Sequence, residues 1–151
     1  MELYEGRPVN TDGRKEKEIK VYDVLDAAGI SYVRVDHPPV ATIEACMGVD
    51  EALGIEICKN LFLCNRQKTA FYLLVMPGKK SLQTKELSKQ IPTSRLSFAS
   101  AEDMEKYLNV TPGSATIMGL IFDPENRVQL LVDEEVLQDE EFACHPCVNT
   151  S

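Results

Sequence analysis

The residue best placed to do chemistry is a lysine inside an apolar run, Ile57-Cys58-Lys59-Asn60-Leu61-Phe62-Leu63. If this run is a strand, its side chains alternate between two faces, so Lys59 shares a face with Leu61 and Leu63. Burying an ammonium group costs free energy unless the group finds a partner or loses its proton. A lysine can also pack its stem while its amine reaches water, and the run alone favours that structural role. A functional cation therefore needs support from elsewhere in the chain.

Two of the five cysteines form the pair Cys144-x-x-Cys147. A redox pair of the thioredoxin type lies between a strand and a helix, whereas this pair follows an acidic stretch. A structural zinc site needs four ligands, and Cys144, His145 and Cys147 offer three. A lone CxxC is a weak pattern, so the redox and zinc hypotheses remain minor alternatives. We expect reduced thiols, because the sequence shows no export signal.

Two further features have both a binding and a structural interpretation, and a third has a structural one. His145 lies near Phe142 and Asn149, and an imidazole beside an amide can bind a polar ligand or serve the core. The turn 112–115 can present backbone N–H groups to a small ligand, or it is a tight turn and nothing more. His37 precedes two prolines, and we interpret it as a polar cap at the end of a strand. No triad signature, phosphate loop or dinucleotide fingerprint is present.

Length and composition indicate an ordinary globular protein with one domain, residues 1–151, in which 1–15 form a flexible or peripheral segment. No apolar run is long enough to span a membrane, and the polar N-terminus lacks the core of a signal peptide. We therefore expect a cytoplasmic protein without a membrane partner. The formal net charge of −8 argues against DNA or extended nucleic-acid binding but leaves room for a local basic patch. Clustered lysines, Lys79, Lys80, Lys85 and Lys89, are interpreted as a solvated face.

Hydrophobic periodicity and turn residues predict an α/β (α+β) fold with a mixed sheet. Helices are expected over 16–28, 42–53, 84–90 and 101–108, with Thr42, Thr84 and Ser100 as caps. A strand is expected over 31–36. Two hairpins are expected, one from 60–64 and 69–76, the other from 116–122 and 127–132.

Four separated motifs, taken together, resemble the prolyl-tRNA-editing family. They are His37-Pro38-Pro39, Cys58-Lys59-Asn60-Leu61-Phe62-Leu63, Thr111-Pro112-Gly113-Ser114 with Gly119-Leu120, and His145-Pro146 with Asn149-Thr150. This family includes the YbaK-like deacylases and the insertion domain of bacterial prolyl-tRNA synthetases. The likeness is strongest to the free-standing PrdX-type branch and covers the chain from about residue 16 onward. In this family, relatives usually continue for another short element beyond the position of Ser151.

The resemblance implies a trans-editing enzyme that hydrolyses the ester between tRNA(Pro) and a wrong amino acid, alanine in this branch. Such an enzyme acts as a second sieve for a product that the synthetase cannot exclude. The implied partners are the acceptor end of tRNA(Pro) and, around it, prolyl-tRNA synthetase or an elongation factor. No cofactor is implied. The implied fold is a curved, mixed and partly barrel-like sheet surrounded by helices.

The resemblance also implies site residues. The functional lysine falls on Lys59, its neighbour on Asn60, the pocket loop on Gly113, Ser114, Ala115 and Ile117, and the C-terminal histidine on His145. Lys59 would supply positive charge near the ribose, phosphate or oxyanion, and Asn60 would orient the substrate. Backbone amides of 113–115 would contact the ester carbonyl, His145 would close the pocket, and a hydroxyl of the tRNA would activate water. The family's loop proline is replaced by Ile117, which puts the rigidity of the loop in question.

We expect the amine of Lys59 to project into an enclosed hollow that also contains His145 and the glycine turn. A non-catalytic module that binds an amino acid or an aminoacylated RNA end is the alternative in another class. It predicts binding without cleavage of the ester.

Overall fold

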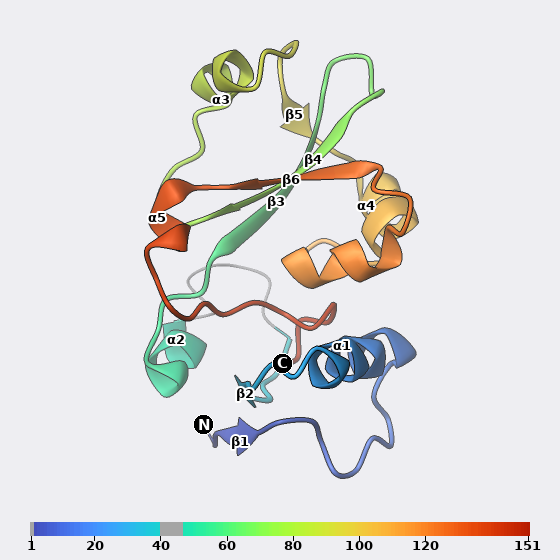
Figure 1. Cartoon of the computed structure of the whole chain (residues 1–151), viewed down its shortest axis with the longest axis vertical. Coiled ribbons are helices and arrows are strands. Elements are labelled where there is room, and N and C mark those ends of the chain that lie inside the picture. Colours follow the sequence, from blue (N-terminus) through green and yellow to red (C-terminus); the bar gives the residue numbers. More distant parts are fainter. Residues whose placement is uncertain (1, 40–46) are drawn as a thin grey trace.

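A computed structural model describes residues 2–39 and 47–151. Its centre is a mixed four-stranded sheet with strand order β5-β3-β4-β6. The strands are β3 (Lys59–Cys64), β4 (Phe71–Met76), β5 (Ser97–Phe98) and β6 (Val128–Val132). Figure 1 shows this sheet in one half of the molecule, with both termini in the other half. The predicted mixed sheet with surrounding helices is confirmed, whereas partial closure into a barrel is not.

The hairpin predicted around residues 65–68 is confirmed. Strands β3 and β4 are antiparallel, with Lys59 opposite Met76 and Cys64 opposite Phe71. Asn65 fixes the turn, because its side-chain oxygen accepts hydrogen bonds from the backbone N–H groups of Thr69 and Ala70. An asparagine that bonds its own turn is a strong local signal, which is why the sequence alone locates this hairpin.

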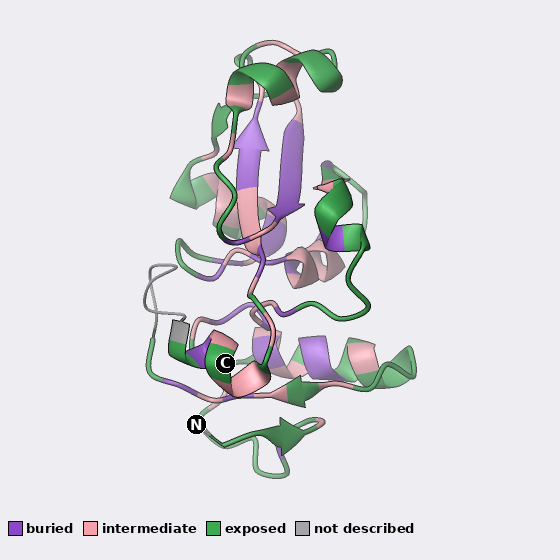
Figure 2. Ribbon diagram, turned by 90° about the vertical axis from the view of Figure 1, so that its left-hand side faces the viewer, coloured by how far each residue is buried: buried purple, intermediate pink, exposed green. Residues whose placement is uncertain are grey.

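Each face of the β3–β4 pair covers a different apolar cluster, and both strands are largely buried (Figure 2). One face packs against the helices α4 (Ala101–Leu108) and η2 (Ile117–Phe122). Its strand residues are Phe62, Cys64, Phe71 and Leu73. The other face packs against α3 (Thr84–Gln90) through Leu63, Tyr72, Leu74 and Met76. This alternation is the period of two that a strand imposes on its side chains.

The other half of the molecule contains α1 (Glu16–Ala27), α2 (Met47–Leu53) and a two-stranded sheet. That sheet pairs β1 (Tyr4–Glu5) with β2 (Val33–Arg34), so the predicted strand 31–36 is present but short. The helix predicted over 16–28 is confirmed. Of the helix predicted over 42–53, residues 42–46 and the cap Thr42 lie outside the described residues, as does Cys46.

The predicted second hairpin is wrong. Residues 117–122 form the 3₁₀ helix η2, and β6 pairs in parallel with β4. The side-chain oxygen of Thr116 accepts a hydrogen bond from Met118 N–H, which starts the helix. Gly119 then lets η2 approach α4 closely, since a Cβ at this position would lie 2.9 Å from Leu108 Cβ. A short apolar run in the sequence does not distinguish a strand from a buried helix. Here these contacts stabilise the helix.

Of the two predicted helix caps that the structure describes, one is confirmed and one is wrong. Ser100 caps α4, accepting a hydrogen bond from Asp103 N–H at 3.1 Å, as predicted. Thr84 does not cap α3, because the cap position is Gln83, whose side chain makes no capping hydrogen bond. The acidic stretch after β6 contains a short helix, α5 (Glu134–Leu137), capped by Asp133. From there the C-terminal tail, residues 139–151, returns to the half that holds α1 (Figure 1).

Candidate active site

A cleft of about 940 Å³ lies between α1, β2, α2 and the C-terminal tail. The groups on its wall that bear on chemistry are Tyr22, His37, Met118, Cys144, His145 and Ser151. The tail is tied to the central sheet by a parallel bridge between Ile57 and Ala143. It is tied to the other half by a hydrogen bond from His37 N–H to Thr150 O at 2.9 Å. These two attachments place the tail's histidine in the cleft.

The two histidines of the chain meet in this cleft, with ring centroids 6.1 Å apart. In each ring Nδ1 lies 2.8 Å from a backbone oxygen, of Pro38 for His37 and of Ser151 for His145. A carbonyl oxygen only accepts, so each Nδ1 carries the proton and each Nε2 presents a lone pair when the ring is neutral. Within the described residues, Nε2 of His37 is buried and has no hydrogen-bond partner. Such an atom is costly unless a water or a ligand satisfies it.

Burial sets the electrostatics of the cleft. It lowers the pKa of His145, and the neighbouring His37 lowers it further, against the opposing hydrogen bond to Ser151. Burial also raises the pKa of Tyr22, whose hydroxyl donates to Glu18 Oε2 at 2.7 Å. Glu18 is held in turn by Arg14 at 2.6 Å. The cleft thus contains the neutral imidazole of His145, and Tyr22 on its wall is bonded to the buried carboxylate of Glu18.

Cys144 lies in the cleft but is a poor nucleophile. Burial raises the pKa of its thiol to about 11, despite an opposing hydrogen bond with Thr116. Burial likewise raises the pKa of Cys147 to about 12. The thiolate is the reactive form of cysteine, and burial disfavours that form at both residues. Among residues 2–39 and 47–151, no three His, Cys, Asp or Glu side chains gather as a metal site, which leaves the zinc hypothesis without ligands there.

Asn60 is bound to the loop that the family resemblance singles out. Its side-chain oxygen accepts a hydrogen bond from Ile117 N–H at 2.8 Å, and its amide donates to Cys58 O at 3.2 Å. Ile117 begins η2, and the next residue, Met118, lines the cleft. Asn60 therefore positions one wall of the cleft through the backbone.

Lys59 lies on the opposite face of β3 from Asn60. Its amine donates to the backbone oxygen of Lys80 at 2.5 Å, and Lys59 is not among the residues that line the cleft. The side chain is partly exposed. The geometry thus differs from the expectation of an amine inside the hollow: the tail that carries His145 passes beside residue 57, while the amine turns toward the segment after β4.

The turn 113–115 is closed upon itself. Ser114 is buried, its N–H donates to Thr111 O at 2.9 Å, and its hydroxyl donates to the same oxygen. Gly113 adopts a φ of +92°, a conformation that only glycine enters without strain. The structure brings this turn to the start of η2, and it does not place Gly113, Ser114, Ala115 or Ile117 on the cleft wall.

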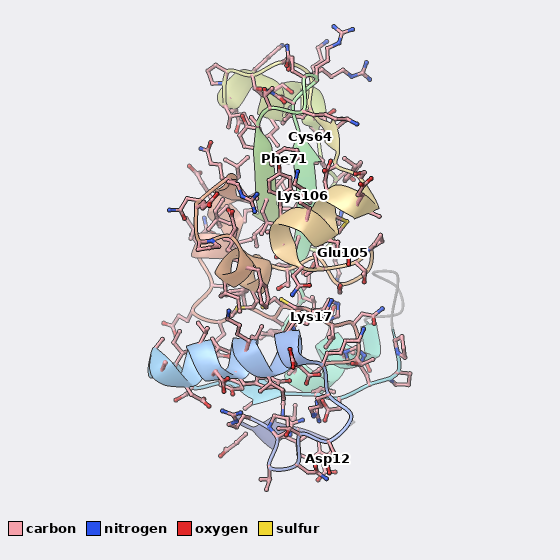
Figure 3. The ribbon with its side chains drawn as sticks, turned by 90° about the vertical axis from the view of Figure 1, so that its right-hand side faces the viewer. Asp12, Lys17, Cys64, Phe71, Glu105 and Lys106 are labelled. Carbon is pink, nitrogen blue, oxygen red and sulfur yellow. The ribbon has the colours of Figure 1, made fainter. Side chains whose placement is uncertain are left out.

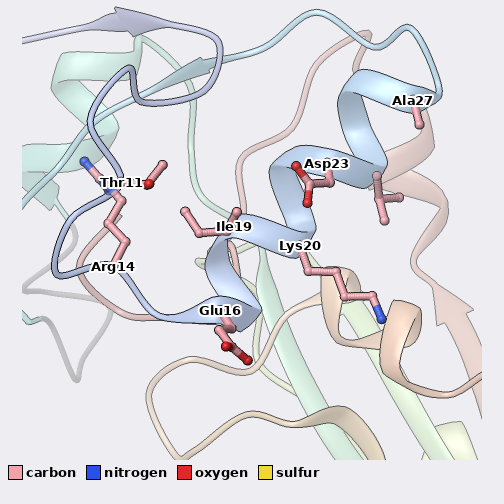
Figure 4. A pocket seen from close by; sticks show the side chains of 8 residues that line it. Thr11, Arg14, Glu16, Ile19, Lys20, Asp23 and Ala27 are labelled. Atoms are coloured by element: carbon pink, nitrogen blue, oxygen red, sulfur yellow. The ribbon is translucent and has the colours of Figure 1, made fainter.

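A second hollow, of about 610 Å³, lies along the outer side of α1 (Figure 4). Its wall carries charges of both signs, from the cations Arg14 and Lys20 and the acids Glu16 and Asp23. It contains none of the predicted site residues and no histidine or cysteine. The cleft with the two histidines is therefore the stronger candidate.

The sequence interpretation missed the part that His37 takes in this cleft. It was interpreted as a cap at a strand end because only its neighbours in the sequence were considered. One signal could have identified it: the chain has only two histidines, and a proline follows each of them.

In the part of the chain that the structure describes, no helix is long and apolar enough to cross a membrane.

The fold is that of an α/β domain with a mixed sheet and surrounding helices, and solved structures share it. The structural likeness is to a crystal structure of a candidate trans-editing enzyme for prolyl-tRNA synthetase. The two share a TM-score of 0.69 and 18% sequence identity, over 90% of this chain and 83% of the other. That likeness concerns the fold alone.

Sequence comparison establishes the family. The chain belongs to the aminoacyl-tRNA editing domain family, whose model matches residues 37–151. It is 32% identical to the prolyl-tRNA editing protein ProX of Acetoanaerobium sticklandii, over 84% of this chain and 77% of that protein. It is also 29% identical to the prolyl-tRNA synthetase associated domain-containing protein 1 of Danio rerio, over 93% of this chain and 74% of that one.

Proposed function

We propose that this protein is a trans-editing deacylase that hydrolyses the ester of mischarged tRNA(Pro), with alanine as the wrong amino acid. One observation carries the proposal: both histidines of the chain meet in one cleft, and both lie inside the region that matches the editing family. The likeness to ProX supports tRNA(Pro) as the RNA. The choice of alanine rests on the resemblance to the free-standing branch.

The dimensions of the cleft suit the end of an aminoacylated RNA. Ligand pockets usually measure about 300–1,000 Å³, and the cleft of about 940 Å³ can hold a terminal adenosine with its amino acid. The unpartnered Nε2 of His37 and the lone pair on Nε2 of neutral His145 would accept hydrogen bonds from the substrate's ammonium or hydroxyl groups. This assigns His145 to the wall of the binding site and adds His37 to it.

The reaction requires a nucleophile and a way to stabilise charge. Water adds to the ester carbonyl, an oxyanion forms, and the ribose oxygen leaves with a proton. Because burial keeps the thiol of Cys144 protonated, water would be the nucleophile, and the free hydroxyl of the terminal ribose would activate it. The enzyme then needs chiefly to orient these groups.

The remaining site residues would act by charge and by position. Lys59 would supply positive charge to the terminal phosphate or ribose at the edge of the sheet. Asn60 would position Ile117 and Met118, and the turn of Gly113, Ser114 and Ala115 would fix where η2 begins. Ile117, in the place of the family's proline, would be held by Asn60 rather than by a rigid ring. The reaction belongs in the cytoplasm, beside prolyl-tRNA synthetase or an elongation factor.

The test is deacylation of a panel of tRNA(Pro) charged with alanine, serine, cysteine or proline, with and without a chelator. Release of alanine with retention of proline, unaffected by the chelator, is the expected result. Binding of charged tRNA without release would favour the non-catalytic module instead. Release of serine or cysteine in preference to alanine would overturn the proposed specificity but leave the deacylase.

A further inference from the structure

The charge of the chain is divided unevenly along its length. Residues 65–96 contain seven of the 16 lysines and arginines but one of the 24 acidic residues. The rest of the chain therefore carries nine cations against 23 acids. A protein with a net charge of −8 thus contains a segment that is strongly cationic.

The fold gathers most of these cations at the end of the molecule that is remote from the cleft. We call this surface the basic end and define it by two residues of the β3–β4 turn, two of α3 and one that precedes β5: Arg66, Lys68, Lys85, Lys89 and Arg95. Figure 1 places α3, β5 and the tip of the hairpin together, opposite α1 and the tail. In Figure 3, side chains ending in nitrogen extend beyond the labelled Cys64 and Phe71, which flank the turn.

Hydrogen bonds hold the three segments of the basic end in register. The backbone N–H of Arg66 donates to Ser94 Oγ at 3.1 Å, and that hydroxyl donates to Gln67 Oε1 at 2.9 Å. On the other side, Thr93 N–H donates to Ser88 O and Leu96 N–H to Ser88 Oγ. The turn, the segment 93–96 and α3 therefore form one connected surface.

The cations of the basic end are not neutralised by ion pairs with the described residues. All five are exposed, and within the described ranges none of them pairs with a carboxylate. By contrast, Lys80, which follows β4 in the chain, forms an ion pair with Asp133 at 2.8 Å. Exposed, unpaired cations repel one another, which costs free energy unless an anionic partner neutralises them.

An aromatic side chain completes the surface. Phe98, on the edge strand β5, is 65% exposed. It stands directly opposite Leu63, so it shares the face of the sheet on which α3 packs. Cations interleaved with an exposed aromatic ring are typical of single-stranded nucleic-acid sites, where the ring stacks on a base.

We propose that the basic end binds the phosphate backbone of an RNA, with Phe98 stacking on an unpaired base or sugar. Strand β3 has six residues and spans about 20 Å, so Lys59 lies about that far along the strand from the basic end. The inference rests on the proposed function, since it names where the substrate's RNA is held.

The experiment compares two triple variants with equal changes of charge. The first, Arg66→Ser/Lys68→Ser/Arg95→Ser, removes three cations of the basic end. The control, Lys15→Ser/Lys20→Ser/Lys106→Ser, removes three exposed cations elsewhere. For the first variant we expect weaker binding of uncharged tRNA(Pro), a KM for deacylation raised about tenfold with kcat retained, and a slope of log K against log salt reduced by about 2–3. The control should change each quantity far less.

Phe98 gives a second, independent measurement. Phe98→Ala should weaken tRNA binding at least about fivefold, and Phe98→Tyr should restore it, because stacking contributes about 1–3 kcal/mol per base. Equal effects of the two triple variants, or an unchanged salt slope in the first, would overturn the proposal. If the wild type binds RNA through the basic end but cleaves no ester, the proposed reaction fails while this inference stands.

Discussion

Two consecutive residues of β3, Asn60 and Lys59, lie in different surroundings. Asn60 faces α4 and η2, and both of its polar groups are bonded to backbone, at Ile117 and Cys58. Lys59 faces the side of α3, and its partly exposed amine reaches a single carbonyl beyond β4. One step along a strand thus separates a residue bonded to the start of η2 from a partly exposed cation. The following predictions test that division, from the largest expected effect to the smallest.

Lys59→Ala should lower the rate of Ala-tRNA(Pro) deacylation by about 100-fold, because the terminal phosphate or ribose loses the charge that positions it. Since the amine has one hydrogen bond and is partly exposed, the free energy of unfolding should change by no more than about 0.5 kcal/mol. Single-turnover assays and urea unfolding measure the two quantities. Lys106→Ala, at an exposed lysine of α4, is the control. Unchanged turnover in folded Lys59→Ala would remove this residue from the mechanism.

Asn60→Ala should lower both activity and stability. It leaves Ile117 N–H without its acceptor, which costs about 1–3 kcal/mol of unfolding free energy. We expect a loss of activity of about tenfold, because the wall at Met118 loses its anchor. Asn60→Asp keeps an acceptor oxygen at this position and should retain more stability. If Asn60→Ala unfolds at the same urea concentration as the wild type, the hydrogen bond does not hold η2.

Gly78→Ala tests the connection between the end of β4 and the tail. A Cβ at this position would lie 2.5 Å from the backbone oxygen of Ile57, so the backbone must shift. The free energy of unfolding should fall by about 1–3 kcal/mol. Activity should also fall, by less than in Asn60→Ala, because Ile57 pairs with Ala143 in the tail. Thermal unfolding measures it, with the exposed Ser81→Ala as control. A fully active Gly78→Ala would show that the tail is positioned by its other attachments.

The pH dependence of stability gives the smallest effect. Burial lowers the pKa of His145, so the unfolded chain binds a proton more readily than the folded one. The contribution of His145 is therefore complete above its unfolded pKa of about 6.5 and is lost as pH falls below it, by about 1.4 kcal/mol for each unit of difference. Urea unfolding between pH 7.5 and 5.5 should show this decline. His145→Gln should flatten it, and an equal decline in that variant would assign the effect to other groups.

Local signals allowed the β3–β4 hairpin, α1, α3 and the Ser100 cap to be predicted, because each depends on neighbours within a few residues. The hairpin 116–122/127–132 failed because its apolar run is equally suited to a strand and to a buried helix. The contact that decides is between Gly119 and Leu108, eleven positions apart in the chain. The parallel pairing of β6 with β4 likewise depends on a crossover that turn residues do not specify.

In the candidate site, too, short motifs could be identified from the sequence, whereas contacts between distant residues could not. The sequence by itself determined the family, through His-Pro, Lys59-Asn60 and the glycine turn, because these motifs are properties of short segments. Only the tertiary structure decided that His37 meets His145, that Asn60 binds Ile117, and that Lys59 turns to the other face. The pairs that meet lie 108 and 57 positions apart, and such pairings are set by which apolar faces bury one another rather than by any local preference.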